Sequence, residues 1–209
     1  MCRVKPSQIS FPGYPFRFGI YENLSLELNP SLHELKMDWE LEFMDWASGW
    51  WTSPILDQVI PWMTYLGSHF AVALFIILTW ILTRRKKKIL ASLVLLYGVQ
   101  SAVIYGVKYL MGRQRPFCFL EGGSKSFRGH ELVLDPGFPS AHSALSFMMA
   151  TLLSVWFPRY RVLFFLLAGF IGWTRIYLYL HYPTDVIAGA LLGYGITAYL
   201  RTVSGREFS

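Results

Sequence analysis

Cysteine is nearly absent from this chain of 209 residues, which contains only Cys2 and Cys118. Two cysteines cannot supply the disulfide framework that stabilises small secreted domains, although a single bridge between them stays open. The N-terminus also lacks a basic segment followed by an apolar core and a small-residue cleavage site. We therefore expect neither a disulfide framework nor a cleaved signal peptide.

Charged side chains are scarce as well, since Asp, Glu, Lys and Arg make up 15% of the sequence against 54% apolar residues. This balance fits a soluble domain poorly and a helical membrane protein well. Residues 1–58 carry eight acidic and four basic residues, a net charge of −4, so the remainder carries +10 because the whole chain is +6. Those basic residues lie between apolar runs or at their ends. They indicate membrane topology and an anion site, and we expect no nucleic-acid partner.

The N-terminal part of the chain differs from the rest in pattern. Residues 1–30 contain four prolines and no sustained period, so we expect an irregular extension. Residues 31–58 take on a helical period and form an amphipathic segment. Such a helix is typical of the membrane interface, and an ordinary helix packed on the membrane domain is the alternative. Its apolar stripe consists of Leu35, Trp39, Phe43 and Trp46.

Five apolar stretches follow, each near the roughly 20 residues that cross the hydrocarbon core as a helix. A polar loop over 111–140, rich in Gly, Pro, Arg and Lys, separates the second from the third. The sequence therefore predicts an all-α integral membrane protein, in which residues 59–203 form a bundle of about five transmembrane helices preceded by the interfacial helix. The stretches are 60–83, 89–110, 141–157, 161–180 and 184–201.

The turns between these spans indicate the topology. Basic clusters at 84–88, 158–161 and 201–206 fall on one side if the spans alternate, and the positive-inside rule makes that side cytoplasmic. The 111–140 loop then faces outward although it carries four basic residues, an exception that an anion-binding site explains. The lipid bilayer is thus an expected partner. The compact chain suggests a bacterial inner membrane, with the active site on the extracytoplasmic side.

Four costly polar residues lie at the outward ends of the spans, namely Lys108, His142, Arg175 and Asp185. A charged residue inside the membrane costs about 2.5–3.5 kcal/mol even on mild insertion scales. Alternation brings all four ends to one leaflet, so a shared functional site explains them together. Taken singly, each has a structural alternative, such as a snorkelling Lys108 or an Arg175–Asp185 ion pair.

The residue types favour a phosphate group as the ligand. Ser140 precedes an apolar helix and is a natural N-cap, so free backbone N–H groups and the positive helix end would face an anion there. Lys108, Arg115 and Arg175 can neutralise phosphate oxygens. No cluster of His, Cys or Asp has metal-ligand spacing, so we expect no metal and no cofactor.

Two histidines supply the remaining chemistry. His142 and His181 provide the proton donor and the nucleophile that transfer through a covalent intermediate requires. Asp185 follows His181 by four residues and could accept its ring N–H and fix the tautomer. Two other residues are weaker candidates. His69 is better interpreted as a packing or hydrogen-bonding residue. For Arg113, contact with the substrate is the less favoured interpretation.

These residues fall into three ordered motifs that resemble the signature of the type 2 phosphatidic acid phosphatase superfamily. That signature reads K-x6-R-P, P-S-G-H and S-R-x5-H-x3-D, and its order and internal spacings are found within residues 55–201. The matching segments are Lys108-x6-Arg115-Pro116, Pro139-Ser140-Ala141-His142 and Thr174-Arg175-x5-His181-x3-Asp185.

The resemblance implies a phosphatase that works through a phosphohistidine. In such an enzyme His181 attacks phosphorus with support from Asp185, while His142 protonates the leaving group and then activates water. Two residues depart from the family pattern. Ala141 replaces Gly, which is tolerable if the backbone there has ordinary helical geometry, and Thr174 replaces Ser while keeping the hydroxyl. The residues implied to hold the phosphate are Lys108, Arg115, Ser140, Ala141 and Arg175.

The expected function is therefore hydrolysis of a membrane lipid phosphate or diphosphate. Undecaprenyl diphosphate is the leading substrate, because short family members with five spans resemble this chain. Phosphatidate, phosphatidylglycerol phosphate and lipid A phosphate are alternatives. Two other functions stay open, namely transfer of the phosphoryl group to another lipid or sugar hydroxyl, and binding or transport of a lipid phosphate without turnover.

Overall fold

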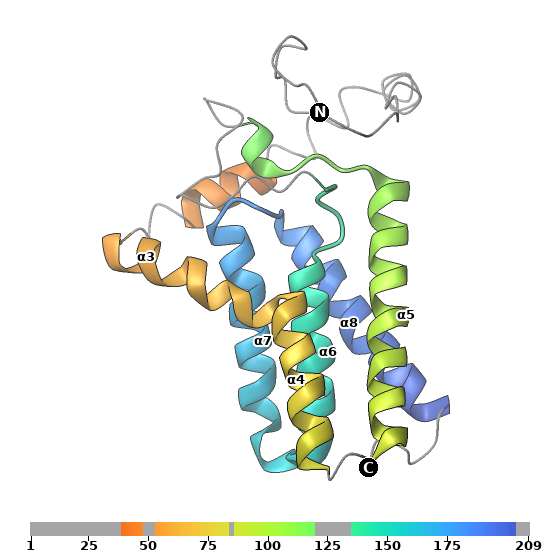
Figure 1. The fold of residues 1–209 in the computed structure, drawn as a ribbon. Helices are drawn as coiled ribbons and strands as arrows, with labels where there is room; N and C mark the ends of the chain where they lie inside the picture. Colours follow the sequence, from red (N-terminus) through yellow and green to blue (C-terminus); the bar gives the residue numbers. More distant parts are fainter. Residues whose placement is uncertain (1–38, 48–52, 84–85, 120–134, 204–209) are drawn as a thin grey trace, which may run out of the picture.

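The computed structural model describes residues 39–47, 53–83, 86–119 and 135–203. The predicted irregular extension 1–30 lies outside these ranges, as do 31–38 and 48–52. Every regular element within them is a helix, so the all-α prediction is confirmed for the described chain (Figure 1). After a short helix over 39–47, the elements are α3 (Pro54–Met63), η2 (Thr64–Gly67), α4 (His69–Leu82), α5 (Lys87–Met111), η3 (Pro116–Phe119), α6 (Ala141–Trp156), η5 (Pro158–Tyr160), α7 (Arg161–Tyr177) and α8 (Pro183–Val203).

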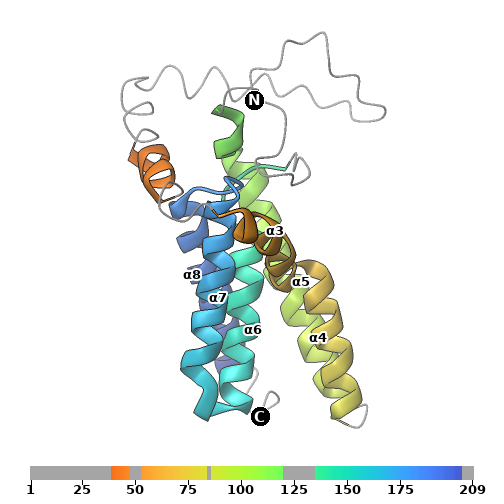
Figure 2. The same ribbon diagram turned by 90° about the vertical axis from the view of Figure 1, so that its left-hand side faces the viewer.

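Helix α6 is the centre of the bundle. It packs mainly against α7 and α8, beside which it runs in both views (Figures 1 and 2). Two glycines of α8 permit this close approach. A Cβ added at Gly189 would meet the carbonyl oxygen of Ser140 at 2.3 Å, and one added at Gly193 would meet that of Ala144 at 2.1 Å. The backbones of α6 and α8 therefore touch at Ser140 and Ala144, and this contact holds the first turn of α6 against α8.

The first apolar stretch is not one straight span over 60–83. The helix starts earlier, at Pro54, because the Ser53 hydroxyl caps it and accepts a hydrogen bond from the Ile55 amide at 3.2 Å. Ser68 then adopts an extended backbone and caps α4, so the two helical parts meet at a bend of 52°. The predicted boundaries are therefore corrected to a bent pair over 54–82, because a capping serine interrupts an otherwise apolar run.

Two helices, α5 and α8, are long and apolar enough to cross a membrane, and the bent pair of α3–η2 with α4 would be a third span. Helix α6 is apolar but has only 16 residues. Helix α7 has 17 residues and carries Arg161 and Arg175 near its two ends. The chain is thus an integral membrane protein with two to three candidate spans among its described residues. Length and composition by themselves support two to three of the five predicted spans.

The two ends of the bundle differ in character. The α4–α5 turn, the α6–α7 turn and the end of α8 all lie at the lower end in Figure 1, and they include Lys86, Arg159 and Arg201. The end of α5, the start of α6 and the α7–α8 turn lie at the opposite end in both views. This arrangement agrees with the predicted alternation, in which the basic turns and the candidate site lie at opposite ends.

The helix over 39–47 lies beside the α7–α8 turn. Its inner face is formed by Glu40 and Met44, which are 2% and 1% exposed, and Met44 packs with Tyr179 and Tyr182. The opposite face is aromatic and exposed. The segment is therefore a helix packed on the bundle with an exposed aromatic face, and its position at the membrane interface stays a prediction. The exposed aromatic residues are Trp39, Phe43 and Trp46.

Candidate active site

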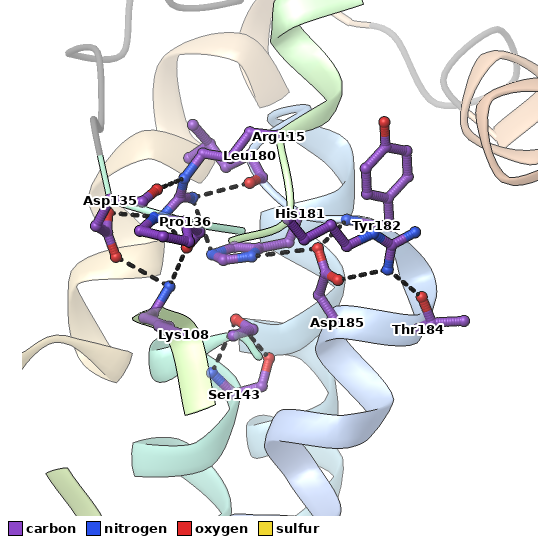
Figure 3. Close-up of polar contacts among 12 residues, drawn as sticks. Lys108, Arg115, Asp135, Pro136, Ser143, Leu180, His181, Tyr182, Thr184 and Asp185 are labelled. Atoms are coloured by element: carbon purple, nitrogen blue, oxygen red, sulfur yellow. Dashed lines mark hydrogen bonds and ion pairs between the residues drawn. The ribbon is translucent and has the colours of Figure 1, made fainter. Parts of the chain in front are cut away.

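The candidate site lies at the upper end of the bundle, where α5 ends and α6 and α8 begin (Figure 3). Lys108 occupies the last turn of α5. That helix ends because Gly112 adopts a left-handed conformation with φ of 57°, and its amide donates to the Lys108 carbonyl oxygen at 3.0 Å. The chain then turns across the helix end and brings Arg115 close to Lys108.

Lys108 and Arg115 share one acidic partner, Asp135. The Lys108 ammonium lies 2.9 Å from one carboxylate oxygen, and Nη2 of Arg115 lies 2.7 Å from the other. Both cations also donate to backbone carbonyls of this segment, Nε of Arg115 to Asp135 at 2.8 Å and Nζ of Lys108 to Pro136 at 2.5 Å. Burial raises the pKa of the Asp135 carboxyl, but the two cations outweigh that effect and hold the pKa below its usual value. An ionised carboxylate therefore bridges the two cations that we expect to bind phosphate.

Arg115 also contacts the imidazole of His181. Its Nη1 donates to the Leu180 carbonyl oxygen at 2.9 Å and lies 3.1 Å from Nε2 of His181. Because an arginine only donates hydrogen bonds, Nε2 must carry the lone pair, and the proton of the neutral ring sits on Nδ1. Burial, and then the nearby charge of Arg115, lowers the pKa of His181 well below the usual histidine value. The ring is therefore neutral at pH 7 with a lone pair on Nε2, as a nucleophile requires.

Asp185 faces the other side of the His181 ring. Its Oδ2 lies 3.6 Å from Nδ1, beyond normal hydrogen-bond length, and Nδ1 has no hydrogen-bond partner among the described residues. The carboxylate is 0% exposed and is held by two other donors, the Tyr182 amide at 2.9 Å and Nη1 of Arg113 at 2.7 Å. Asp185 and His181 thus lie next to each other as predicted, without a hydrogen bond between them. The Tyr182 amide and Arg113 set the position of the carboxylate.

Arg175 is a buried cation to which the described part of the chain supplies no acidic partner. Its side chain is 4% exposed, its Nη1 donates to the Thr64 hydroxyl at 2.8 Å, and its Nε finds no hydrogen-bond partner in the segments that the structure describes. No carboxylate within the described ranges forms an ion pair with it. A buried charge without a counterion is costly, so a bound anion would complete this arrangement.

The start of α6 has the predicted capping geometry. The Ser140 hydroxyl accepts a hydrogen bond from the Ser143 amide at 3.4 Å, and the Ser140 amide donates to the Asp185 carbonyl oxygen at 3.0 Å. Ala141 begins the helix and has no positive φ, so a methyl group in place of the usual Gly is accommodated. His142 is half-buried in the same turn. Its charged neighbours are Arg175, Arg115 and Lys108.

Several residues of this cluster are not apparent from the sequence motifs. Three of them lie far in sequence from the residues that they contact, and no local pattern links them to the motifs. They are Glu40, Thr64 and Asp135. Nη1 of Arg113 donates to Oδ1 of Asp185 and to the Thr184 hydroxyl, each at 2.7 Å, and so helps to hold Asp185 in place. The hydrogen-bonding interpretation of His69 is confirmed, since its two ring nitrogens lie 2.8 and 2.9 Å from the hydroxyls of Tyr97 and Tyr105.

The fold and the site together define a helical membrane protein with a buried cluster of cations and histidines. The chain belongs to the PAP2 superfamily, whose family model matches residues 89–208. The predicted family resemblance is therefore confirmed, and the matched region includes all three motifs.

Individual relatives carry different names. The chain is 40% identical to the lipid A 1-phosphatase of Rhizobium johnstonii over 90 residues, which are 42% of this chain and 36% of that protein. It is 30% identical to the undecaprenyl-diphosphatase of Sulfolobus acidocaldarius over 111 residues, 53% of this chain and 52% of that protein. The crystal structure of Aquifex aeolicus LpxE matches with a TM-score of 0.65 and 29% identity, over 78% of this chain and 94% of that one. The chain thus spans little more than a third of the lipid A 1-phosphatase.

Proposed function

We propose that this protein is a membrane lipid phosphatase that forms a phosphohistidine at His181. The proposal rests on the buried charge of Arg175, which lies near Lys108, Arg115 and the lone pair of His181 and has no acidic partner among the described residues. Three cations with one bridging carboxylate leave positive charge for phosphate oxygens. Phosphoryl transfer depends mainly on such positioning and charge stabilisation.

In the first step the lone pair on Nε2 of His181 attacks phosphorus, in line with the bond to the leaving oxygen. The N–P bond forms while the P–O bond breaks, and its electron pair stays on the leaving oxygen. His142, whose charged form the bound phosphate stabilises against the neighbouring cations, donates a proton to that oxygen. Asp185 stabilises the positive charge of the phosphorylated ring through Nδ1–H. The phosphate oxygens are held by Lys108, Arg115, Arg175, Ser140 and the backbone at Ala141.

In the second step neutral His142 takes a proton from a water molecule, whose oxygen attacks phosphorus. The N–P bond breaks and its electron pair returns to Nε2 of His181. Inorganic phosphate leaves, and both histidines regain their starting protonation states. The two steps require one residue to act first as an acid and then as a base, a role suited to an imidazole.

We infer a five-span arrangement, with the bent pair, α5, α6, α7 and α8 crossing the bilayer. The basic turns then face the cytoplasm by the positive-inside rule. The site lies at the extracytoplasmic surface of a bacterial inner membrane. A lipid headgroup would enter it sideways while its acyl or prenyl chains stay in the bilayer.

Undecaprenyl diphosphate is the substrate that we propose first. The undecaprenyl-diphosphatase of Sulfolobus acidocaldarius is similar to this chain over about half of either protein. Lipid A phosphate is the second candidate, because the lipid A 1-phosphatase is 40% identical over its matching 90 residues. Phosphatidate and phosphatidylglycerol phosphate complete the panel to be tested.

The test is phosphate release by detergent-purified protein in excess chelator, with each of the four lipid phosphates, for wild type and His181→Gln. We expect chelator-resistant release that is lost in the variant, and an acid-labile phosphoryl label on wild type alone. The relative rates rank the substrates. Equal rates in wild type and variant, or no release from any lipid, would overturn the proposal.

The same assay separates the two other functions. A phosphotransferase would place labelled phosphate on an added lipid or sugar hydroxyl in preference to water. A binding or transport protein would retain a lipid phosphate without releasing inorganic phosphate. Intact His181, His142 and Asp185 favour turnover, since binding alone requires none of them to transfer a proton or a phosphoryl group.

A further inference from the structure

The helix over 39–47 lies outside the region that matches the family model, yet its buried acid reaches the candidate site. Glu40 is 2% exposed, and both of its carboxylate oxygens have partners. Oε1 accepts from the Thr184 amide at 3.2 Å and from the Thr184 hydroxyl at 2.7 Å, and Oε2 accepts from Nη2 of Arg113. The helix therefore holds the first turn of α8 through a single side chain.

Arg113 continues this chain of contacts towards His181. While Nη2 binds Glu40, Nη1 donates to Oδ1 of Asp185 at 2.7 Å, and the guanidinium lies 4.2 Å from the centre of the Tyr182 ring. The second oxygen of Asp185 is the one that faces Nδ1 of His181. One planar cation thus spans two buried carboxylates, and its orientation sets the rotation of the Asp185 carboxylate.

We propose that Glu40 is a positioning residue of the active site, which acts through Arg113 to hold Asp185 against His181. The inference rests on the proposed function for its effect on turnover. It makes the N-terminal helix part of the catalytic apparatus, although none of the three motifs includes it. Asp185 lies 3.6 Å from Nδ1, so its distance from the ring depends on how firmly its other partners hold it.

A purely structural role for Glu40 makes different predictions. If it only attached the helix to the bundle, its loss would lower stability and leave the His181 ring unchanged in the folded fraction. Other contacts also attach this helix, namely Met44 against Tyr179 and Tyr182, and Asp45 bound to the Tyr179 hydroxyl. The helix therefore has anchors that do not pass through Asp185, and removal of the Glu40 charge alone should leave it docked.

The first measurement does not depend on activity. Ring ¹⁵N shifts of His181 report the tautomer, and the contact from Arg115 predicts a ring with its proton on Nδ1 in wild type. In Glu40→Gln we expect a smaller share of this tautomer, because a loosened Asp185 attracts the Nδ1 proton less. Glu42→Gln, an exposed acid on the same helix, is the matched control and should leave the shifts at wild-type values.

The second measurement is steady-state turnover on the best lipid substrate. We expect Glu40→Gln to lower kcat about tenfold with little change in KM, since misplacement of a catalytic group by a fraction of an ångström acts on the chemical step. The phosphate-binding cations keep their contacts, so substrate affinity is preserved. If Glu40→Gln fails to fold, Arg113→Lys breaks the same link from the other end and is expected to give the same tautomer shift.

The outcomes separate this inference from the proposed function. Unchanged His181 shifts in a folded Glu40→Gln protein overturn the positioning role, whatever the activity. A wild-type protein that releases no phosphate overturns the proposed function, while the tautomer measurement still decides whether Glu40 controls Asp185. A tautomer shift together with a lower kcat in Glu40→Gln, and neither effect in Glu42→Gln, supports both.

Discussion

Nη1 of Arg115 lies 3.1 Å from Nε2 of His181 and 2.9 Å from the Leu180 carbonyl oxygen. The arginine therefore donates to the lone pair of the imidazole and also holds the turn that carries this ring. A phosphate group that approached Nε2 would meet the same guanidinium. Arg115 thus lies between the predicted nucleophile and the predicted phosphate site, where its position and its charge both act on the two.

Arg115→Lys tests this coupling. A lysine ammonium cannot span Asp135, the Leu180 carbonyl and Nε2 of His181 together, because it lacks the planar fork of the guanidinium. We expect kcat/KM for phosphate release to fall by about 100-fold or more, the usual result of losing a donor to the transition state. Arg159→Lys, at the opposite end of the bundle, is the control. Equal activity in Arg115→Lys and wild type would show that the fork is dispensable.

The titration of His181 is a second prediction. Burial and the nearby cations lower its pKa well below the usual value, so its ring should stay neutral as the pH falls through about 6.5. The unfolded chain takes up a proton in that range and the folded chain does not. The residue therefore lowers the stability of the folded state as the pH falls from about 6.5 to the folded pKa, and has no such effect above pH 7.

NMR titration of the His181 ring in the ligand-free protein measures this directly. An added phosphate analogue such as vanadate should raise the apparent pKa, because the bound anion favours the charged ring. A free-protein titration centred near 6.5 would contradict the burial argument. No change on addition of vanadate would contradict the placement of the anion beside the ring.

Asp135→Asn is a third prediction. Asp135 neutralises Lys108 and Arg115, so its loss leaves two buried cations with less compensation. We expect the free energy of unfolding to fall by about 2 kcal/mol, and inorganic phosphate to inhibit more strongly because it no longer competes with the carboxylate. Thermal unfolding with and without phosphate measures both effects. Unchanged inhibition by phosphate would mean that Asp135 and the substrate do not share these cations.

The pH dependence of this variant has a defined sign. The folded pKa of Asp135 lies below its usual value, so its stabilisation is complete above about pH 4 and is lost as the pH falls through the folded pKa. The difference in stability between wild type and Asp135→Asn should therefore be constant near neutral pH and should disappear in acid. A difference that persisted in strong acid would argue against an ionised Asp135 as its source.

The contact between α6 and α8 gives a fourth prediction. A Cβ at position 193 would lie 2.1 Å from the Ala144 carbonyl oxygen, a backbone atom that cannot move alone, so Gly193→Ala must separate the helices. We expect a loss of about 1–3 kcal/mol in detergent unfolding, with reduced activity because Ser140 moves away from Asp185. Gly195→Ala, where an added Cβ meets nothing within 4 Å, should be neutral or slightly stabilising. Equal stability of the two variants would contradict the close contact.

Local pattern was sufficient for much of the architecture. The apolar runs predicted the helices, and Ser140 was correctly identified as the cap that begins α6. It failed at Ser68, where a polar cap inside an apolar run bends the first stretch by 52°. Hydropathy averages over a window and does not register a single capping side chain, which explains the missed bend.

The sequence by itself determined the class of the protein, because the motif spacings and hydropathy are local properties of the chain. It also identified Lys108, Arg115, Arg175, His142, His181 and Asp185 as one candidate set. Only the tertiary structure decided which groups support them. Glu40 contacts Arg113, and Thr64 contacts Arg175, across large separations in sequence. Asp135 likewise bridges Lys108 and Arg115. Such pairing of buried charges depends on the packed geometry and leaves no periodic pattern in the sequence.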